Sequence, residues 1–199
     1  MTQIKSGGMD PFFFGYGSLV NRATHDYPEA QPARARGWRR TWRHIAGRRA
    51  AVLAAIPDPD SVIDGLIAAV PAADWQALDR REEAYDRVEA AGQIDHAMGP
   101  DTQVAIYTIP VAKHPPAPQK QPVLLSYLDV VIAGYLREFD ADAALRFFDT
   151  TDGWGTVLDD RADPIYPRHQ RLSRSDHDFV DQALVRHGVP RVNRSDVGF

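Results

Sequence analysis

The sequence has no cysteine, and only three of its 23 basic residues are lysines. Without cysteine there is no disulfide, no thiolate metal site and no cysteine nucleophile, and we expect a cytoplasmic location. No apolar run approaches the length of roughly 18 residues that a membrane-spanning helix needs, so no membrane contact is expected. The net charge of −4 at pH 7 excludes an overall basic field that would attract nucleic acid.

The chain of 199 residues has 44% hydrophobic and 25% charged residues, which is ordinary for a globular protein with a sizeable core. Residues 1–10 contain one lysine and no long apolar stretch. We therefore expect a disordered leader there and no signal peptide. The remainder is interpreted as a domain over residues 11–140, followed by a helical C-terminal extension over residues 141–199 that packs on the same domain.

Hydrophobic alternation and short apolar runs in residues 12–110 predict five or six strands and one helix. The clearest strand signal is in residues 37–47, where Trp38, Arg40 and Trp42 share one face. Residues 50–71 are typical of a strand, a proline- and aspartate-rich turn and a second strand. The predicted strands are 12–16, 37–47, the two halves of 50–71, and 101–110.

Helical signals dominate the second part of the chain. A proline-rich stretch, 110–122, is interpreted as a linker or an active-site lid. Helices are predicted over residues 122–139, 141–150 and 173–188. The predicted fold class is α+β, a small mixed β-barrel with a helical C-terminal extension.

Glu82 lies on the apolar stripe of a helix predicted over residues 75–86. The stripe consists of Trp75, Leu78, Glu82 and Tyr85, and the opposite face carries Asp79, Glu83 and Asp86. A partly buried carboxylate is costly unless it is paired or used, and burial raises its pKa. Glu82 therefore either pairs with an arginine such as Arg39 or Arg43, or serves as a proton acceptor near neutral pH.

An apolar strand runs into the small-residue turn Tyr16-Gly17-Ser18-Leu19, and Leu78-Asp79-Arg80-Arg81-Glu82 follows about sixty residues later. Together these segments resemble the gamma-glutamylcyclotransferase-like family, over residues 12 to about 140. Tyr85, Arg87 and Gly65 also fit the family's pattern, and the segment SYLDVVIAG resembles a family helix whose tyrosine, here Tyr127, reaches the substrate.

The resemblance implies an enzyme without metal or organic cofactor that acts on small gamma-glutamyl compounds. The α-amine of the substrate attacks its own γ-carbonyl, releasing 5-oxoproline and an amine or amino acid. Glu82 would be the general acid and base. Tyr16, Gly17, Ser18 and Leu19 would bind the substrate, because Gly17 and Ser18 let backbone N–H groups approach its oxygens, and Tyr127 would hydrogen-bond it.

Several alternatives remain open from the sequence. The pocket could belong to a non-catalytic protein that binds a small carboxylate or amide. Seven arginines in residues 34–49 could bind nucleic acid, although we favour a strand whose arginines pair with acidic residues. Residues 149–168 could cap the cleft and select the leaving amine, although we favour a packed loop that ties the last helix to the barrel. The seven histidines lack metal-ligand spacing, so no metal is expected. The leaving group stays open, as does the choice between monomer and homodimer.

Overall fold

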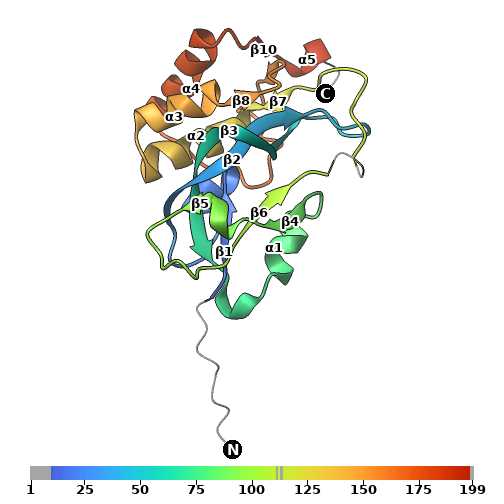
Figure 1. Ribbon diagram of the computed structural model, residues 1–199. Helices are drawn as coiled ribbons and strands as arrows, with labels where there is room; N and C mark the ends of the chain where they lie inside the picture. Colours follow the sequence, from blue (N-terminus) through green and yellow to red (C-terminus); the bar gives the residue numbers. More distant parts are fainter. Residues whose placement is uncertain (1–9, 111, 113, 198–199) are drawn as a thin grey trace, which may run out of the picture.

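A computed structural model describes residues 10–110, 112 and 114–197, and it consists of one curled mixed sheet flanked by helices (Figure 1). The strands are β1 (Phe12–Gly15), β2 (Gln31–Arg43), β3 (Val52–Ala69), β4 (Asp86–Glu89), β5 (Ile94–Asp95), β6 (Val104–Thr108), β7 (Val123–Leu124), β8 (Thr151–Asp152), β9 (Val157–Leu158) and β10 (Arg191–Val192). The helices are α1 (Gln76–Arg81), α2 (Leu125–Glu138), α3 (Ala141–Asp149), α4 (Arg174–Arg186) and α5 (Arg194–Val197), with short 3-10 helices at Ser18–Val20, Arg22–Thr24, Pro71–Ala73 and Ala91–Gln93.

The main sheet has the strand order β4-β6-β1-β3-β2-β5, and β8 pairs with β2. Strand β6 runs parallel to β1 and also pairs with β3 at Ala55 and Thr108. This second pairing brings the first half of β3 round toward β6, so the sheet curls into a half-barrel. The predicted α+β class is confirmed, with the barrel only half closed.

Residues 50–71 form one strand, so the prediction of two strands separated by a turn is wrong. Arg36 pairs with Val62, and Trp38 pairs with Pro57. Between these two pairs, β3 contains several more residues than β2. The proline- and aspartate-rich stretch is therefore a bulge within β3. Both halves of β3 keep the same neighbour, β2, because the bulge bends the strand without reversing it.

Helix α1 is much shorter than the predicted 75–86. It ends at Arg81, and the Glu82 backbone N–H still donates to the Leu78 carbonyl at 2.9 Å. The chain then turns so that β4 can pair antiparallel with β6. Sheet pairing has overridden the helical pattern here, which places Glu82 at the helix end rather than within it.

Three helices of the second half appear where the sequence predicts them, as α2, α3 and α4. Helix α2 is buried along most of its length and contacts the 3-10 helix at Ser18–Val20 as well as α3 and α4. In Figure 1, α3 and α4 lie at one end of the sheet, and α1 lies at the other, beside β4. A small parallel sheet of order β10-β9-β7 ties the last part of the chain to the start of α2.

The described part of the proline-rich stretch is held against the end of β2. Pro116 bridges to Ile45, and the Gln121 side chain hydrogen-bonds the Ile45 backbone N–H and carbonyl at 2.9 and 2.8 Å. Of the predicted leader, residues 1–9 lie outside the described residues, and Asp10 accepts the Ala72 backbone N–H at 2.9 Å. Within the described ranges, no helix combines the length and apolarity needed to cross a membrane.

Candidate active site

A cavity of about 360 Å³ opens where the turn after β1, the end of α1 and the start of α2 meet. A smaller hollow of about 30 Å³ adjoins it and shares five lining residues with it. The shared residues are Ser18, Leu53, Glu82, Tyr85 and Tyr127. The two spaces therefore form one site that surrounds Glu82.

Glu82 is the carboxylate among the residues that line this site. Its side chain is only 15% exposed, and its Oε1 lies 3.2 Å from the Nε of Arg81. Burial raises the pKa of Glu82, and the positive charges of Arg81 and then Arg168 oppose the rise. The net direction is upward, which suits a group that must accept and return a proton near neutral pH.

Arg81 fastens the carboxylate to the turn that follows β1. Its two terminal nitrogens donate to the Thr24 carbonyl at 2.8 Å and to the Ser18 hydroxyl at 3.2 Å. The Glu82 ion pair is therefore with its own sequence neighbour. The alternative partners Arg39 and Arg43 are wrong, and Arg39 instead pairs with Asp152. Helical spacing did not point to Arg81, because adjacent residues lie on different faces of a helix.

The turn after β1 is held at both ends. The Tyr16 hydroxyl donates to the Tyr107 carbonyl at 2.7 Å, and the Val20 backbone N–H donates to the Gly17 carbonyl at 3.0 Å. A Cβ atom on Gly17 would lie 2.6 Å from the Tyr127 hydroxyl. Only glycine lets the backbone come this close to the phenol. The close approach seen here is therefore to a side chain of the protein, and the approach of this backbone to a substrate stays a prediction.

Three tyrosines surround the carboxylate. Burial raises the pKa of Tyr16, Tyr85 and Tyr127 well above the ordinary tyrosine value. Their hydroxyls therefore stay protonated over the physiological range and can donate hydrogen bonds. The Tyr85 hydroxyl donates to the Leu53 carbonyl at 2.7 Å. The Tyr127 ring packs edge-on against Trp42 and Tyr166, so this residue combines a packing role with access to the cavity.

A buried arginine is connected to the turn after β1 through a tyrosine hydroxyl. Arg40 is fully buried and donates to the Tyr135 hydroxyl at 2.7 Å, and that hydroxyl lies within hydrogen-bond distance of the carbonyls of Tyr16, at 3.0 Å, and Asp64, at 2.7 Å. Burial lowers the pKa of Arg40. Its other donors bind the hydroxyls of Thr150 and Thr151, on the segment that β8 ties to β2. Arg40 thus links the turn to the C-terminal part of the chain.

The structure brings the predicted site residues together. Glu82, Ser18 and Tyr127 line the larger cavity, and Tyr16, Gly17 and Leu19 line the adjoining hollow. Sequence reasoning missed Arg81, Tyr166 and Arg168. Both interpretations of residues 149–168 hold in part. Most of the segment is packed, since β8 pairs with β2 and β9 with β7, whereas Tyr166 and Arg168 line the cavity.

The arginine-rich stretch 34–49 contributes mainly to the sheet. Its ion pairs join Arg34 to Asp64, Arg36 to Asp95 and Arg39 to Asp152. Among the described residues, no group of three or more histidine, aspartate or glutamate side chains is arranged to hold a metal ion.

Comparison with known proteins gives a family and a fold. The family model described as "Gamma-glutamyl cyclotransferase, AIG2-like" matches residues 13–127, more than half of the chain. No curated protein matches the sequence. A solved structure described as a gamma-glutamyl cyclotransferase is similar with a TM-score of 0.56 and 13% identity, over 87% of this chain and 99% of that one. An uncharacterized protein from Homo sapiens gives a TM-score of 0.57 with the same identity and coverage. At this identity the likeness concerns the fold.

Proposed function

Because the chain belongs to the gamma-glutamyl cyclotransferase, AIG2-like family, we propose that it is an enzyme that cyclises the gamma-glutamyl group of a small substrate. The α-amine attacks the γ-carbonyl of the same molecule, a new C–N bond closes the ring, and the C–N bond to the leaving amine breaks. The products are 5-oxoproline and an amine or amino acid. The nucleophile and electrophile share one molecule, so much of the rate comes from holding it folded.

The observation that carries this proposal is the buried Glu82 carboxylate in the wall of the cavity, with its pKa raised. In the proposed mechanism Glu82 takes a proton from the substrate α-ammonium, which frees the amine to attack. It then gives this proton to the leaving nitrogen, so the carboxylate is regenerated, and the second proton that the ring nitrogen loses on becoming an amide protonates the released amine to an ammonium ion. The Arg81 contact fixes the orientation of the carboxylate and keeps its basicity moderate.

The turn after β1 supplies the second half of the proposed mechanism. Backbone N–H groups at Gly17 and Ser18 would hold the oxygens of the substrate, and the protonated hydroxyl of Tyr127 would donate a hydrogen bond to it. These groups line the same site as Glu82, so one small molecule can meet both. A negative charge that develops on the carbonyl oxygen would then lie beside fixed donors, in a site partly shielded from water.

The test is to incubate the wild type and the Glu82→Gln variant with a panel of gamma-glutamyl compounds and measure 5-oxoproline by mass spectrometry. We expect the variant to lose about 10²- to 10⁴-fold in kcat, the usual contribution of a positioned acid–base group, while substrate binding is kept. Glu83→Gln is the matched control, because Glu83 is exposed and lies outside the cavity lining.

Two results would contradict the proposal. Equal turnover by the wild type and Glu82→Gln would remove Glu82 as the base. Binding of the compounds in a thermal-shift assay, with no 5-oxoproline from any of them, would favour a non-catalytic protein that binds a small carboxylate or amide in the same pocket.

A further inference from the structure

We infer that the leaving amine of the substrate carries a carboxylate, as in an amino acid or peptide, and that Arg168 and Arg48 recognise it. This inference rests on the proposed function and names the substrate class of the same site. It separates gamma-glutamyl amino acids and peptides from gamma-glutamylamines that lack an acidic group.

The cavity is lined by cations far more than by anions. Its charged residues are Arg48, Arg49, Arg81, Arg168 and Glu82. Arg81 is occupied, since it pairs with Glu82 and binds Thr24 and Ser18. Reaction at Glu82 therefore takes place in a site with surplus positive charge, which favours an anionic ligand.

Two of these arginines are available for a ligand. Arg48 and Arg168 are exposed and line the cavity, and within the described part of the chain neither guanidinium forms an ion pair. Most other arginines of the protein do form ion pairs, including Arg34, Arg36 and Arg39. Arginine presents a rigid fork of N–H donors that fits both oxygens of a carboxylate.

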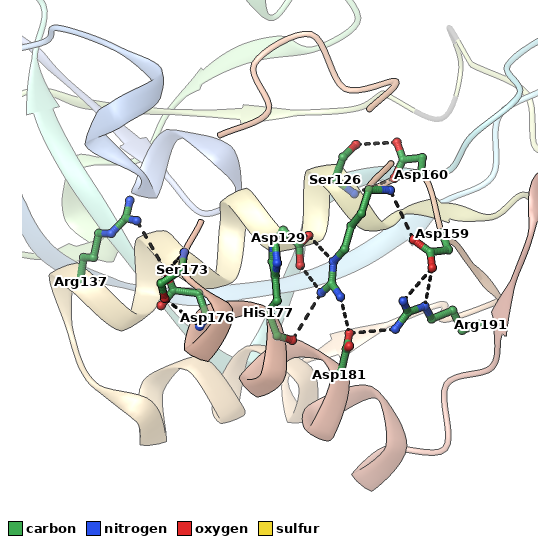
Figure 2. Close-up of polar contacts among 11 residues, drawn as sticks. Ser126, Asp129, Arg137, Asp159, Asp160, Ser173, Asp176, His177, Asp181 and Arg191 are labelled. Atoms are coloured by element: carbon green, nitrogen blue, oxygen red, sulfur yellow. Dashed lines mark hydrogen bonds and ion pairs between the residues drawn. The ribbon is translucent and has the colours of Figure 1, made fainter. Parts of the chain in front are cut away.

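The segment that carries Arg168 is anchored to α2. Asp160 accepts the Ser126 backbone N–H at 2.7 Å and the Ser126 hydroxyl at 2.6 Å, as Figure 2 shows for their side chains, and it also accepts the Ile165 backbone N–H at 2.9 Å. Arg161 binds both oxygens of Asp129 at 2.7 Å. These contacts fix the chain just before Tyr166 and Arg168.

The anchored segment reaches the reacting side of the cavity. The ring of Tyr166 lies edge-on to that of Tyr127, with centroids 5.0 Å apart. The charge of Arg168 lowers the pKa of Glu82, which places the guanidinium within electrostatic reach of that carboxylate. Arg48 comes from a different segment, the connection between β2 and β3, where its carbonyl accepts a hydrogen bond from the Gln121 side chain.

This arrangement divides the substrate between two regions. The gamma-glutamyl group lies between Glu82 and the turn after β1, and the leaving amine extends toward the exposed arginines. A carboxylate on the leaving amine would form charge-assisted hydrogen bonds there. A leaving amine without an acidic group would leave both cations unused and would bind more weakly.

The experiment compares two substrates that differ in one charge, gamma-glutamylalanine and gamma-glutamylalaninamide. We expect the wild type to prefer the acid by at least about tenfold in kcat/KM, the effect of a charge-assisted hydrogen bond at a partly exposed site. Arg168→Gln and Arg48→Gln should each reduce this preference, mainly by raising KM for the acid. Arg171→Gln is the matched control, because Arg171 is exposed and lies outside the cavity lining.

Equal kcat/KM for the acid and the amide would overturn the inference, as would a preference that survives in both the Arg168→Gln and Arg48→Gln variants. A thermal-shift assay of the two compounds on Glu82→Gln reads the same preference without turnover. If neither compound yields 5-oxoproline but the acid alone stabilises Glu82→Gln, the arginine site stands and the proposed reaction fails.

Discussion

The hydroxyl oxygen of Tyr127 lies 2.6 Å from the position that a Cβ atom would occupy on Gly17. Helix α2 and the turn after β1 therefore touch at a point where no side chain fits. We expect Gly17→Ala to displace the phenol or the turn, and to lower both stability, by about 1–3 kcal/mol, and kcat/KM for 5-oxoproline formation. Denaturation with urea and the 5-oxoproline assay check the two effects.

A double variant tests the cause. Tyr127→Phe removes the oxygen that the new methyl group would meet, so Gly17→Ala should cost less in that background than in the wild type. The expected coupling is about 0.5–3 kcal/mol, the usual range for residues in contact. If the losses in stability from Gly17→Ala and Tyr127→Phe simply add in the double variant, the proposed close contact between residues 17 and 127 is wrong.

The raised pKa of Glu82 predicts a pH-dependent difference in stability between the wild type and Glu82→Gln. The native state keeps this proton to a higher pH than the unfolded chain, so the wild type loses native stability as pH rises from about 4.3, the ordinary glutamate value, to the raised native pKa. Glutamine cannot ionise and escapes this loss. As the pH rises through this range, the free energy of unfolding of Glu82→Gln should therefore increase relative to that of the wild type.

The measurement is urea denaturation of both proteins at a series of pH values on either side of this window. The difference should become constant above the native pKa of Glu82. A difference that moves in the opposite direction would mean that the Arg81 ion pair outweighs burial and that the native pKa is lowered.

The buried Tyr135 hydroxyl accepts from Arg40 and lies within hydrogen-bond distance of two carbonyls, 3.0 Å from that of Tyr16 and 2.7 Å from that of Asp64. Tyr135→Phe removes the hydroxyl that links Arg40 to the Tyr16 carbonyl, and among these groups only the Arg40 bond to the Asp64 carbonyl at 2.8 Å remains, so we expect a loss of about 1–3 kcal/mol in stability. Thermal denaturation should show a Tm lower by about 2–10 °C for a chain of this size. Activity should fall as well, because the Tyr16 carbonyl belongs to the turn that lines the site.

Tyr27→Phe is the control for this substitution. Within the described residues the Tyr27 hydroxyl makes no hydrogen bond, and its ring packs against Phe13 in either variant. Its Tm should stay close to that of the wild type. An equal loss in the two variants would show that the Tyr135 network contributes nothing beyond ring packing.

Gly134 of α2 should be a position where alanine destabilises the helix instead of stabilising it. Alanine normally stabilises a helix over glycine by about 1 kcal/mol, but a Cβ atom on Gly134 would lie 2.8 Å from the backbone nitrogen of Asn21. We expect Gly134→Ala to destabilise the protein, by about 1–3 kcal/mol. Gly92→Ala, which has no atom within 4 Å of its Cβ, should be nearly neutral. Stabilisation by Gly134→Ala would contradict the close packing of α2 on the turn.

Much of the fold followed from local patterns. The sequence predicted β2, α3 and α4 because each of these elements buries one face. Helix α2 is buried along most of its length, and its apolar residues at helical spacing predicted it. The family is confirmed, and the turn after β1 lines the same hollow as Glu82, two segments that only the resemblance had connected. Glu82 was singled out correctly as an inward-facing carboxylate, although the helix that suggested it ends one residue earlier.

The features that the sequence did not predict depend on contacts between residues that are far apart in the chain. The bulge in β3 resembles a turn in sequence and is decided by the register with β2. The sequence placed Arg40 on the strand face of Trp38 and Trp42 and predicted acidic partners for the arginines of this stretch, but the acceptors around Arg40 are carbonyl and hydroxyl oxygens. Arg168 lies far from the family's motifs in the sequence, and its segment is held at the cavity by long-range contacts such as that of Asp160 with Ser126.

The small sheet of β10, β9 and β7 can be completed only after Arg191–Val192 has been synthesised. Its central strand pairs on one side with the residues before α2 and on the other with Arg191–Val192. The half-barrel uses residues up to 108 in its main hydrogen-bonded order, so a growing chain can assemble that sheet long before the wall holding Tyr166 and Arg168 is secured. We expect a ribosome-bound chain to form its half-barrel first and this wall of the cavity last.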